Sequence, residues 1–402
     1  YDDPADAQKY FDYVTDTYSE YNAAKELSLE EAEEDVNYLF DAFYYDFAFY
    51  DYFGGHTVFD QAKAEILQEL QAKDNLTCKD LQEVLVKHLT FIKDGHFNIN
   101  HNFPAEKEIP FFFRQVMFVK TDSGYQDSKG KTVVSVDGHP DLDTLFKRSI
   151  SKEGYLVYYP VLLKEAKFDG TEWDKHVCDE QLTVHYADGS TDVLTADTWS
   201  QYYKDLPKGQ NTDLHQTDGI PVFQFNSFDG SFLQEVNAAA AQMSDAAISM
   251  LDLRSNVGGY EEVAHQWITR YSRQRVQGNG VRYDVVNPVS VAIAHRWQTH
   301  DNILILLSGK CSASSAEITM DLAYNLENSL ILGENTNGCM IGNGGHVELP
   351  NSKCSVIMTS VCVYLLPEGA DYFEEMRGLS PDIWVPAKEA ETLAAKLMEN
   401  LK

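Results

Sequence analysis

Positively charged residues are scarce in this sequence. Its 402 residues include 32 Lys and Arg against 63 Asp and Glu, which gives a formal net charge of −31. A surface of this charge repels phosphate backbones and anionic lipid headgroups, so we expect neither nucleic acid nor a membrane surface as a partner. Neutral or cationic peptides suit such a surface better than acidic ones.

Long apolar runs are also missing, and none approaches the roughly 20 residues that a transmembrane helix needs. The first 30 residues are polar and acidic, unlike a signal peptide. With the Tyr-rich and Lys-poor composition, this favours a mature chain, trimmed of a signal, at an extracellular or cell-surface location. At 44% hydrophobic residues, the chain can bury the cores of two or three domains.

No Cys-x-x-Cys pair is present among the six cysteines, so their spacing does not fit a structural zinc site. An even number of cysteines permits disulfides without requiring them, and we expect buried free thiols. We expect no metal and no cofactor. The cysteines are Cys78, Cys178, Cys311, Cys339, Cys354 and Cys362.

Hydrophobic periodicity divides the chain into three regions. Residues 1–95 are predicted to be helical, with a capping box at Ser28 and apolar residues at three- and four-residue steps behind it. Residues 96–212 are predicted to be β-rich, with a hairpin around Asp188-Gly189. Residues 213–402 alternate strands and helices, which is typical of a mostly parallel sheet covered by helices. The fold class is therefore α/β, or α+β in several domains.

Within the third region we expect individual strands and helices. The predicted strands are 219–225, 247–253, 302–307, 330–332 and 356–366, and the predicted helices are 234–242, 261–270, 316–326 and 387–401.

Four motifs stand in order at the predicted strand and turn boundaries of this region. They are DLRSNVGG (252–259), SASSAE (312–317), GENTNG (333–338) and GLSPD (378–382). Together they resemble the tail-specific, or C-terminal processing, protease family and its tricorn-core relatives, over about residues 80–100 and 218–386. The resemblance implies a ClpP/crotonase-like catalytic core and a serine endopeptidase that works through an acyl-enzyme, on a peptide or protein substrate.

Ser314 is the nucleophile that the resemblance implies, because the family's serine stands three residues before the glutamate of its motif, here Glu317. A serine hydroxyl needs a base to take its proton and donors for the oxyanion that then forms. The Ser315 amide, at a helix N-terminus, and the amides of Gly258 and Gly259 are the predicted oxyanion hole. The same Ser-x-x-Glu pattern is also a capping box, which leaves helix capping as the alternative role of the hydroxyl.

A lysine base is missing from its expected position. Family members with a serine–lysine dyad carry the lysine 25 residues after the serine, and here that residue is Cys339. No lysine lies between Lys310 and Lys353. Nothing in the sequence marks Cys339 itself as an activated nucleophile.

A histidine base is the remaining possibility within the resemblance, since tricorn-like members use an upstream histidine supported by a C-terminal glutamate. On this basis His96 and Glu375 complete a Ser–His–Glu triad, and an imidazole suits base catalysis at neutral pH. Tricorn-like members carry a second serine before the histidine, where this chain has Gly95, so the way in which the glutamate is oriented stays open. His346 is the alternative base and Glu374 the alternative carboxylate.

Other interpretations also stay open. Residues 132–140 resemble the end of a PDZ domain without its glycine-rich loop, so the middle region is either a degenerate PDZ or a different β domain. A catalytically inactive peptide- or apolar-ligand-binding protein on the same fold, or a cell-envelope structural module, could also have this sequence. Geometry discriminates: His96 and Ser314 farther apart than one water can bridge would favour binding over catalysis. The sequence does not indicate an oligomeric state.

Overall fold

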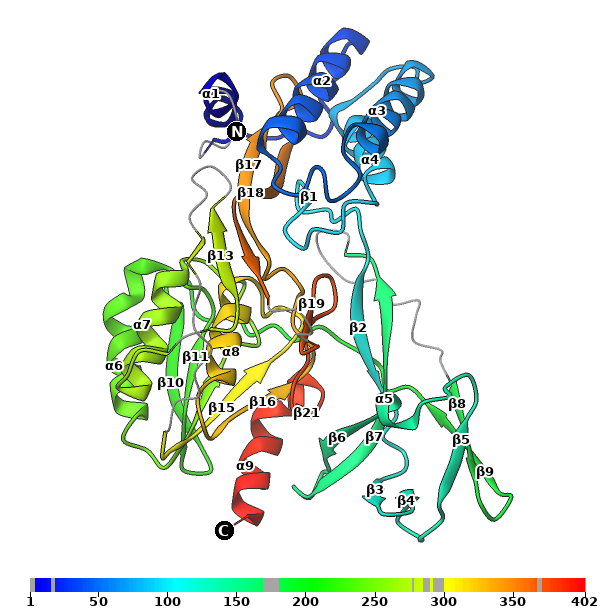
Figure 1. The fold of residues 1–402 in the computed structure, drawn as a ribbon, viewed down its shortest axis with the longest axis vertical. Helices are drawn as coiled ribbons and strands as arrows, with labels where there is room; N and C mark the ends of the chain where they lie inside the picture. Colours follow the sequence, from blue (N-terminus) through cyan, green and yellow to red (C-terminus); the bar gives the residue numbers. More distant parts are fainter. Residues whose placement is uncertain are drawn as a thin grey trace.

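The computed structural model describes residues 4–15, 19–168, 181–276, 278–284, 290–291, 300–366 and 371–401. It shows a mixed α/β protein of several parts, which confirms the predicted fold class. In Figure 1 a layer of helices lies at the top, an α/β core at the lower left and a β-rich part at the lower right.

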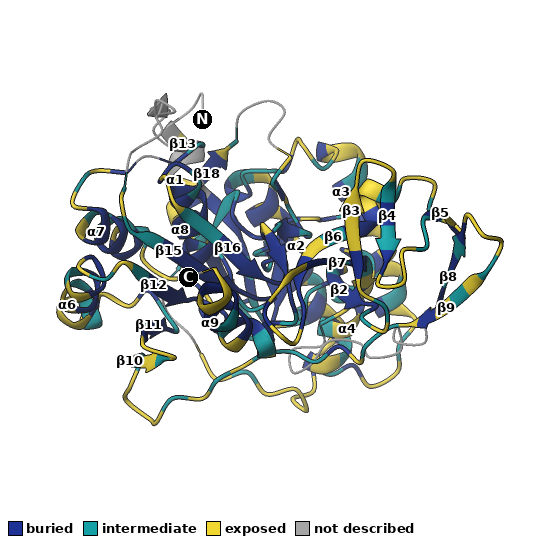
Figure 2. Cartoon of the chain, turned by 90° about the horizontal axis from the view of Figure 1, so that it is seen from below, coloured by how far each residue is buried: buried dark blue, intermediate teal, exposed yellow. Residues whose placement is uncertain are grey.

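The α/β core is built on a six-stranded sheet in the order β10-β11-β12-β15-β16-β21, parallel except for the β10–β11 pair. Alternate residues of β15 face opposite sides: Leu304 and Leu306 pack with α6, α7 and α8, while Ile305 and Leu307 pack with α9. Figure 2 shows the mostly buried strands between helices whose outer faces are exposed. The strands are β10 Thr212–Thr217, β11 Ile220–Phe225, β12 Ile248–Asp252, β15 Ile303–Ser308, β16 Ser329–Gly333 and β21 Ile383–Trp384, and the helices are α6 Leu233–Met243, α7 Glu261–Ser272, α8 Ser315–Tyr324 and α9 Ala390–Asn400.

The helical layer contains α1 to α4, and the predicted capping box is present, with the Ser28 side chain accepting from the Glu31 amide. The apolar faces of α2, α3 and α4 form a cluster that also includes Val347, Val356 and Met358 from a C-terminal hairpin. This hairpin, β17–β18, extends from the core up to the helices in Figure 1. The N-terminal helices therefore share their core with a segment from the far end of the chain. The elements are α1 Pro4–Tyr13, α2 Leu29–Asp46, α3 Gly55–Gln71, α4 Cys78–His88, β17 Gly342–Glu348 and β18 Ser355–Leu365.

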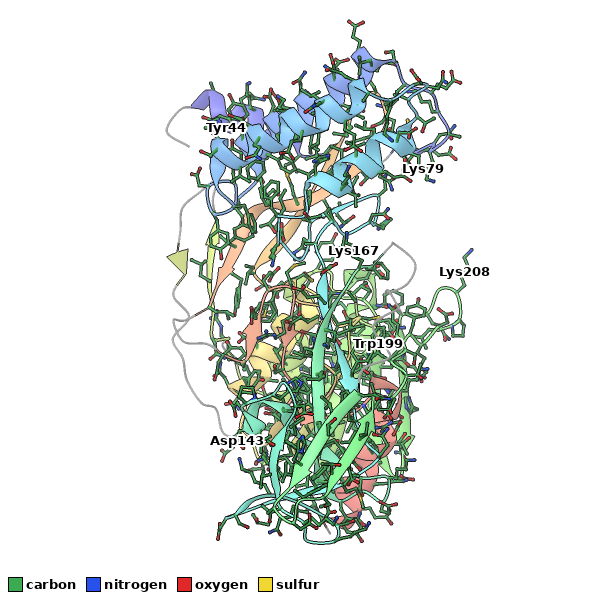
Figure 3. All side chains as sticks on the ribbon, turned by 90° about the vertical axis from the view of Figure 1, so that its right-hand side faces the viewer. Tyr44, Lys79, Asp143, Lys167, Trp199 and Lys208 are labelled. Atoms are coloured by element: carbon green, nitrogen blue, oxygen red, sulfur yellow. The ribbon has the colours of Figure 1, made fainter. Side chains whose placement is uncertain are left out.

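The β-rich part has a five-stranded sheet, ordered β2-β7-β3-β4 with β6 beside β7, and a three-stranded sheet ordered β5-β8-β9. The hairpin predicted around Asp188-Gly189 is formed by β8 and β9. In Figure 3, β2 and β7 extend alongside the core, and Lys208 stands on a projecting loop. The elements are β2 Lys107–Phe112, β3 Phe118–Thr121, β4 Gly124–Asp127, β5 Val133–Val136, α5 Leu142–Leu145, β6 Phe146–Ile150, β7 Leu156–Ala166, β8 Gln181–Tyr186 and β9 Thr191–Thr195.

The predicted strands and helices of the core are all present, with ends that differ by a few residues. The closing helix predicted over 387–401 begins with a 3₁₀ turn before α9, because the chain enters it directly from Pro386. None of the helices among the described residues is both long and apolar enough to cross a membrane. The remaining elements are β1 Asn98–Ile99, η1 Gly230–Phe232, β13 Val281–Asp284, β14 Ser290–Val291, β19 Phe373–Glu374, β20 Gly378–Leu379 and η2 Ala387–Glu389.

Four of the six cysteines have side chains that the structure describes, and all four are free thiols. Cys78, Cys339 and Cys354 are buried, and Cys311 is partly buried. Cys178 and the side chain of Cys362 lie outside the described part of the chain.

Candidate active site

Ser314 occupies a strained turn between β15 and α8, immediately before the helix begins. Its φ of 54° and ψ of −115° lie outside the regions that a non-glycine residue usually adopts. Sharp strand-to-helix turns of this kind present a serine hydroxyl at the end of a sheet. Ser314 Oγ lies 3.2 Å from Nε2 of His96, so the predicted nucleophile and base are within hydrogen-bond reach.

Glu317 organises the backbone around this serine from the first turn of α8, where its side chain is fully buried. One carboxylate oxygen accepts the Ser314 amide at 3.0 Å and the Cys339 amide at 3.0 Å. The other accepts the Gly338 amide at 2.7 Å and the Thr336 hydroxyl at 2.5 Å. The Glu317 carboxylate thus forms its half of the capping box and also binds the loop of residues 336–339. This structural role leaves the Ser314 hydroxyl in contact with His96.

His96 is held by a short loop whose conformation Asp94 sets. The buried Asp94 carboxylate accepts the His96 amide at 3.0 Å and the Thr359 amide at 2.9 Å. Asp94 Oδ1 lies 4.0 Å from His96 Nδ1, and that nitrogen is buried without a hydrogen-bond partner among the described residues. Burial, assisted by the charge of Lys107, lowers the pKa of His96, while Asp94 opposes the change. The imidazole is therefore neutral, as a base must be, down to mildly acidic pH.

Glu375 lies on the turn after β19, beside the same loop. Its Oε1 accepts the Gly95 amide at 2.8 Å, and its Oε2 accepts the Ile341 amide at 3.3 Å. Burial, followed by repulsion from Asp94, raises the pKa of Glu375 well above its usual range. Glu375, Asp94 and His96 each offer an atom within 4.8 Å of the others. The structure thus brings all three predicted triad residues together and adds a second carboxylate.

These three side chains could also surround a divalent cation, since carboxylate oxygens and an imidazole are metal ligands. Both carboxylates already accept amide hydrogens from neighbouring loops. The two carboxylates are therefore already bonded within the protein, as parts of a hydrogen-bonded frame around His96.

The alternative residues lie in different surroundings. Glu374 is 63% exposed and forms an ion pair with Arg377. His346 Nδ1 is bonded to the carbonyl oxygen of Thr15, on the side of the N-terminal helices. Cys339 is buried, and burial raises its thiol pKa well above the ordinary value, so it is not an activated thiolate.

The predicted oxyanion-hole amides differ in whether they already donate a hydrogen bond within the protein. The Gly258 amide donates to Asn256 Oδ1 at 2.8 Å, while the Gly258 carbonyl accepts the Phe228 amide at 2.8 Å. Because the carbonyl and N–H of one trans peptide point in opposite directions, the Gly259 N–H points away from Phe228. The Ser315 hydroxyl donates to the Gly259 carbonyl at 2.7 Å and fixes the next peptide. Of the three predicted amides, those of Gly259 and Ser315 therefore remain the candidates for an oxyanion hole.

At two positions beside the predicted catalytic groups, there is no room for a side chain larger than that of glycine. A Cβ on Gly258, where φ is +96°, would lie 2.8 Å from the Cβ of Ser314. A Cβ on Gly95 would lie 2.5 Å from the Cβ of Cys339 and 2.0 Å from the Gly338 carbonyl oxygen. The tricorn-like serine before the histidine therefore has no room here, which explains why this position is glycine.

Sequence reasoning missed three residues of this centre. The sequence predicts no role for Asp94 or Lys107, and it predicts Glu317 only as a position of the SASSAE motif and its capping box. The Asp-x-His spacing was a usable signal for Asp94, because a carboxylate two residues before a histidine can bond its amide in a tight turn. No local signal marks Lys107, which comes from another part of the fold.

An α/β core with a serine on a strand–helix turn, a histidine at its hydroxyl and carboxylates behind the histidine is the arrangement of a serine hydrolase. Residues 219–385 match the model of Peptidase family S41. The predicted resemblance to tail-specific proteases is thereby confirmed for this segment.

One solved structure agrees at the level of the fold, and two others are more distantly similar. Mature CPAF has a TM-score of 0.50 and 12% identity, with 93% of this chain and 96% of that chain covered. The photosystem II D1 C-terminal processing protease has a TM-score of 0.39 and 16% identity over 89% of this chain and 93% of that chain. The tricorn protease has a TM-score of 0.41 and 13% identity over 92% of this chain and 37% of that chain. A comparison with curated protein sequences gave no match.

Proposed function

We propose that this protein is a serine endopeptidase with Ser314 as nucleophile, His96 as general base and the carboxylates of Glu375 and Asp94 supporting the histidine. The observation that carries the proposal is the 3.2 Å contact between Ser314 Oγ and His96 Nε2. Two residues that are 218 positions apart in sequence meet at the distance that proton transfer requires.

The proposed reaction proceeds by acyl transfer. His96 Nε2 removes the proton of Ser314 as Oγ attacks the substrate carbonyl carbon, and the oxyanion forms beside the amides of Gly259 and Ser315. The imidazolium then gives its proton to the leaving amine, and the peptide C–N bond breaks. A water molecule, deprotonated by His96, hydrolyses the acyl-enzyme and regenerates Ser314.

The two carboxylates have separate tasks in this proposal. Asp94 is the closer to His96 Nδ1, at 4.0 Å, and favours the imidazolium once the proton has been transferred. Glu375 holds the peptide that precedes the histidine through the Gly95 amide. Among the described residues His96 Nδ1 has no hydrogen-bond partner, and it can gain one when the charge forms, as catalytic hydrogen bonds often tighten during reaction.

Space for a substrate lies directly beside Glu375. A cavity of about 590 Å³ is lined by the aromatic residues Phe49, Tyr52 and Phe53 of the helical layer and by acidic side chains that include Glu106 and Glu165. Its volume is in the range of small-ligand pockets, roughly 300–1,000 Å³. We propose that it receives neutral or cationic peptide segments, in keeping with the charge of the whole chain.

A fluorophosphonate probe tests the assignment of the nucleophile. We expect covalent labelling of the wild-type protein and none of Ser314→Ala. Ser312→Ala is the matched control, because Ser312 is a buried neighbour whose hydroxyl donates to the Leu253 carbonyl at 2.8 Å. It should lose stability and keep the label. Labelling that survives in Ser314→Ala would overturn the proposal.

The second candidate, a non-catalytic peptide-binding protein, predicts that peptides bind in the cavity without being cleaved. The contact between Ser314 and His96 favours catalysis over this alternative. Mass spectrometry of peptides after long incubation decides between the two, since intact peptides with saturable binding would support the binding protein. We also propose an extracellular or cell-surface location on composition alone, which fractionation of the producing cells tests.

A further inference from the structure

Two lysines are almost fully buried next to the catalytic loops. Lys107, the first residue of β2, is 1% exposed, and Lys310, after β15, is 2% exposed. Lys107 Nζ donates to the Gly95 carbonyl at 2.8 Å and to the side-chain oxygen of Asn337. Lys310 Nζ donates to the carbonyls of Thr336 at 2.7 Å and Arg377 at 3.0 Å. The two residues have similar burial and similar partners, but only Lys107 contacts the loop that carries His96.

A buried ammonium is unfavourable unless opposite charge and acceptors surround it. Asp94 and Glu317 raise the pKa of both His96 and Glu375, and Lys107 acts on both in the opposite direction. Without a cation these carboxylates would repel one another in a region with little water. The sequence provides that cation from β2, in the β-rich part of the molecule.

Further contacts connect β2 to the turn that carries Glu375. The Glu108 amide donates to the Met376 carbonyl at 3.2 Å, and the Glu108 carboxylate pairs with Arg377 at 2.5 Å. Lys107 therefore cannot move relative to the Glu375 turn without breaking these bonds. The strand holds the ammonium in a fixed place between the histidine loop and the glutamate turn.

We propose that Lys107 is a positioning residue for the peptidase reaction proposed above: it fixes the His96 loop through the Gly95 carbonyl and supplies the positive charge that the surrounding carboxylates require. Glu375 holds the amide side of Gly95 and Lys107 holds its carbonyl side. Gly95, the residue before the proposed base, is thus bonded to an acid at its amide and to a cation at its carbonyl. Lys107 acts through this loop and does not touch the substrate.

The charged groups that face His96 are Asp94 on its own loop, Lys107 on β2, Glu317 on α8 and, beside the Gly95 amide, Glu375. Lys107 lowers the pKa of His96 and opposes the rise in the pKa of Glu375. Removing its charge moves both pKa values in the same direction, upward. The neutral imidazole and the ionised glutamate would then both require a higher pH.

The test compares Lys107→Met, Lys107→Arg and Lys310→Met. In Lys107→Met we expect the ascending limb of kcat/KM against pH to move up by about one pH unit, so that kcat/KM at the acidic end falls about tenfold beyond any loss at the plateau. Lys107→Arg keeps the charge and should restore the position of the limb even if its plateau is lower. Lys310→Met, with equal burial, should lose a comparable amount of stability and keep the limb in place.

A second readout does not depend on activity. In a Ser314→Ala background, the His96 ring protons, assigned by their loss in His96→Gln, are titrated by NMR with and without Lys107→Met. We expect the His96 pKa to rise when the lysine is removed. An unchanged His96 pKa, or an equal shift in Lys310→Met, would overturn the role of Lys107. Absence of probe labelling in a wild-type protein whose His96 responds to Lys107 would instead reject only the peptidase proposal.

Discussion

Two clusters of buried charge lie at the carboxyl ends of the strands of one sheet, and they differ in how completely their polar atoms are bonded. Arg254, after β12, donates to both oxygens of Asp252, to Glu391 and to the Ala387 carbonyl, all at 2.7 to 2.8 Å. In the catalytic cluster, His96 Nδ1 is buried without a partner among the described residues.

The difference separates a structural cluster from a chemical one. Buried polar atoms normally find partners, so a fully bonded group stabilises one conformation and an unbonded one needs an explanation. Arg254 also lies 4.1 Å from the centre of the Tyr202 ring, which closes its remaining face. In the proposed mechanism, His96 Nδ1 gains a bond only when the ring gains a proton.

The largest effect should come from the nucleophile. Ser314→Ala is expected to lower kcat by a factor on the order of 10⁴ or more, because no other group in the site can form the acyl-enzyme. Its free energy of unfolding should change by less than about 1 kcal/mol, since the hydroxyl makes few structural contacts. Peptide hydrolysis and urea unfolding measure the two quantities. A large loss of stability would place Ser314 with the structural cluster instead.

Arg254→Met should show the opposite pattern. Removing this arginine leaves the buried Asp252 and the partly buried Glu391 without their cation, which is expected to cost about 3–5 kcal/mol of stability. Urea unfolding monitored by tryptophan fluorescence measures the loss. The molecules that remain folded should keep the wild-type pH dependence of kcat/KM, and a displaced pH profile would show that the two clusters are coupled.

The two carboxylates behind His96 can be separated from each other. Asp94→Asn and Glu375→Gln are each expected to lower kcat by a factor of about 10² or more, because each disturbs the base in the step that transfers the proton. Asp94→Asn should also reduce stability, since Asp94 binds the Thr359 backbone and side chain. Parallel kinetics and thermal unfolding test this division. Full activity in Glu375→Gln would leave Asp94 as the sole partner of the histidine.

The pH dependence gives the smallest and sharpest test. A base must be neutral, and the neutral fraction of histidine rises with pH through its pKa. Because burial lowers the pKa of His96, the ascending limb of kcat/KM should lie below the ordinary histidine value of about 6.5. A limb well above that value, abolished by Glu375→Gln, would assign the titration to Glu375, whose pKa burial raises.

Local patterns in the sequence were sufficient for the core and for the strand–helix turn that carries Ser314. Strands such as β15 are uninterrupted apolar runs, and Ser314 lies at a strand–helix boundary that periodicity alone locates. Triad partners from distant segments could be assigned only through the resemblance to a family. Spacing could not reveal Lys107, because its role depends on how β2 packs against loops far away in sequence.

The packing of the N-terminal helices against the β17–β18 hairpin could also not be predicted from local sequence patterns. The helices α2 to α4 are amphipathic, and their pattern predicts that an apolar face must be covered without saying by what. The structure shows that Val347, Val356 and Met358 cover part of it. The division of the chain at residue 95 remains a prediction about sequence regions.

During synthesis of the chain, the apolar cluster of the helical layer is completed late, because it includes residues of this hairpin. The helical layer emerges early, yet the residues that complete its apolar cluster follow only after the α/β core has been made. Asp94 also lacks its anchor until β18 has been made, because the Thr359 backbone that binds it belongs to β18. A fragment that ends before β18 lacks both contacts, so we expect it to expose apolar surface of the helical layer, to aggregate, and to leave the loop of the proposed base without its anchor.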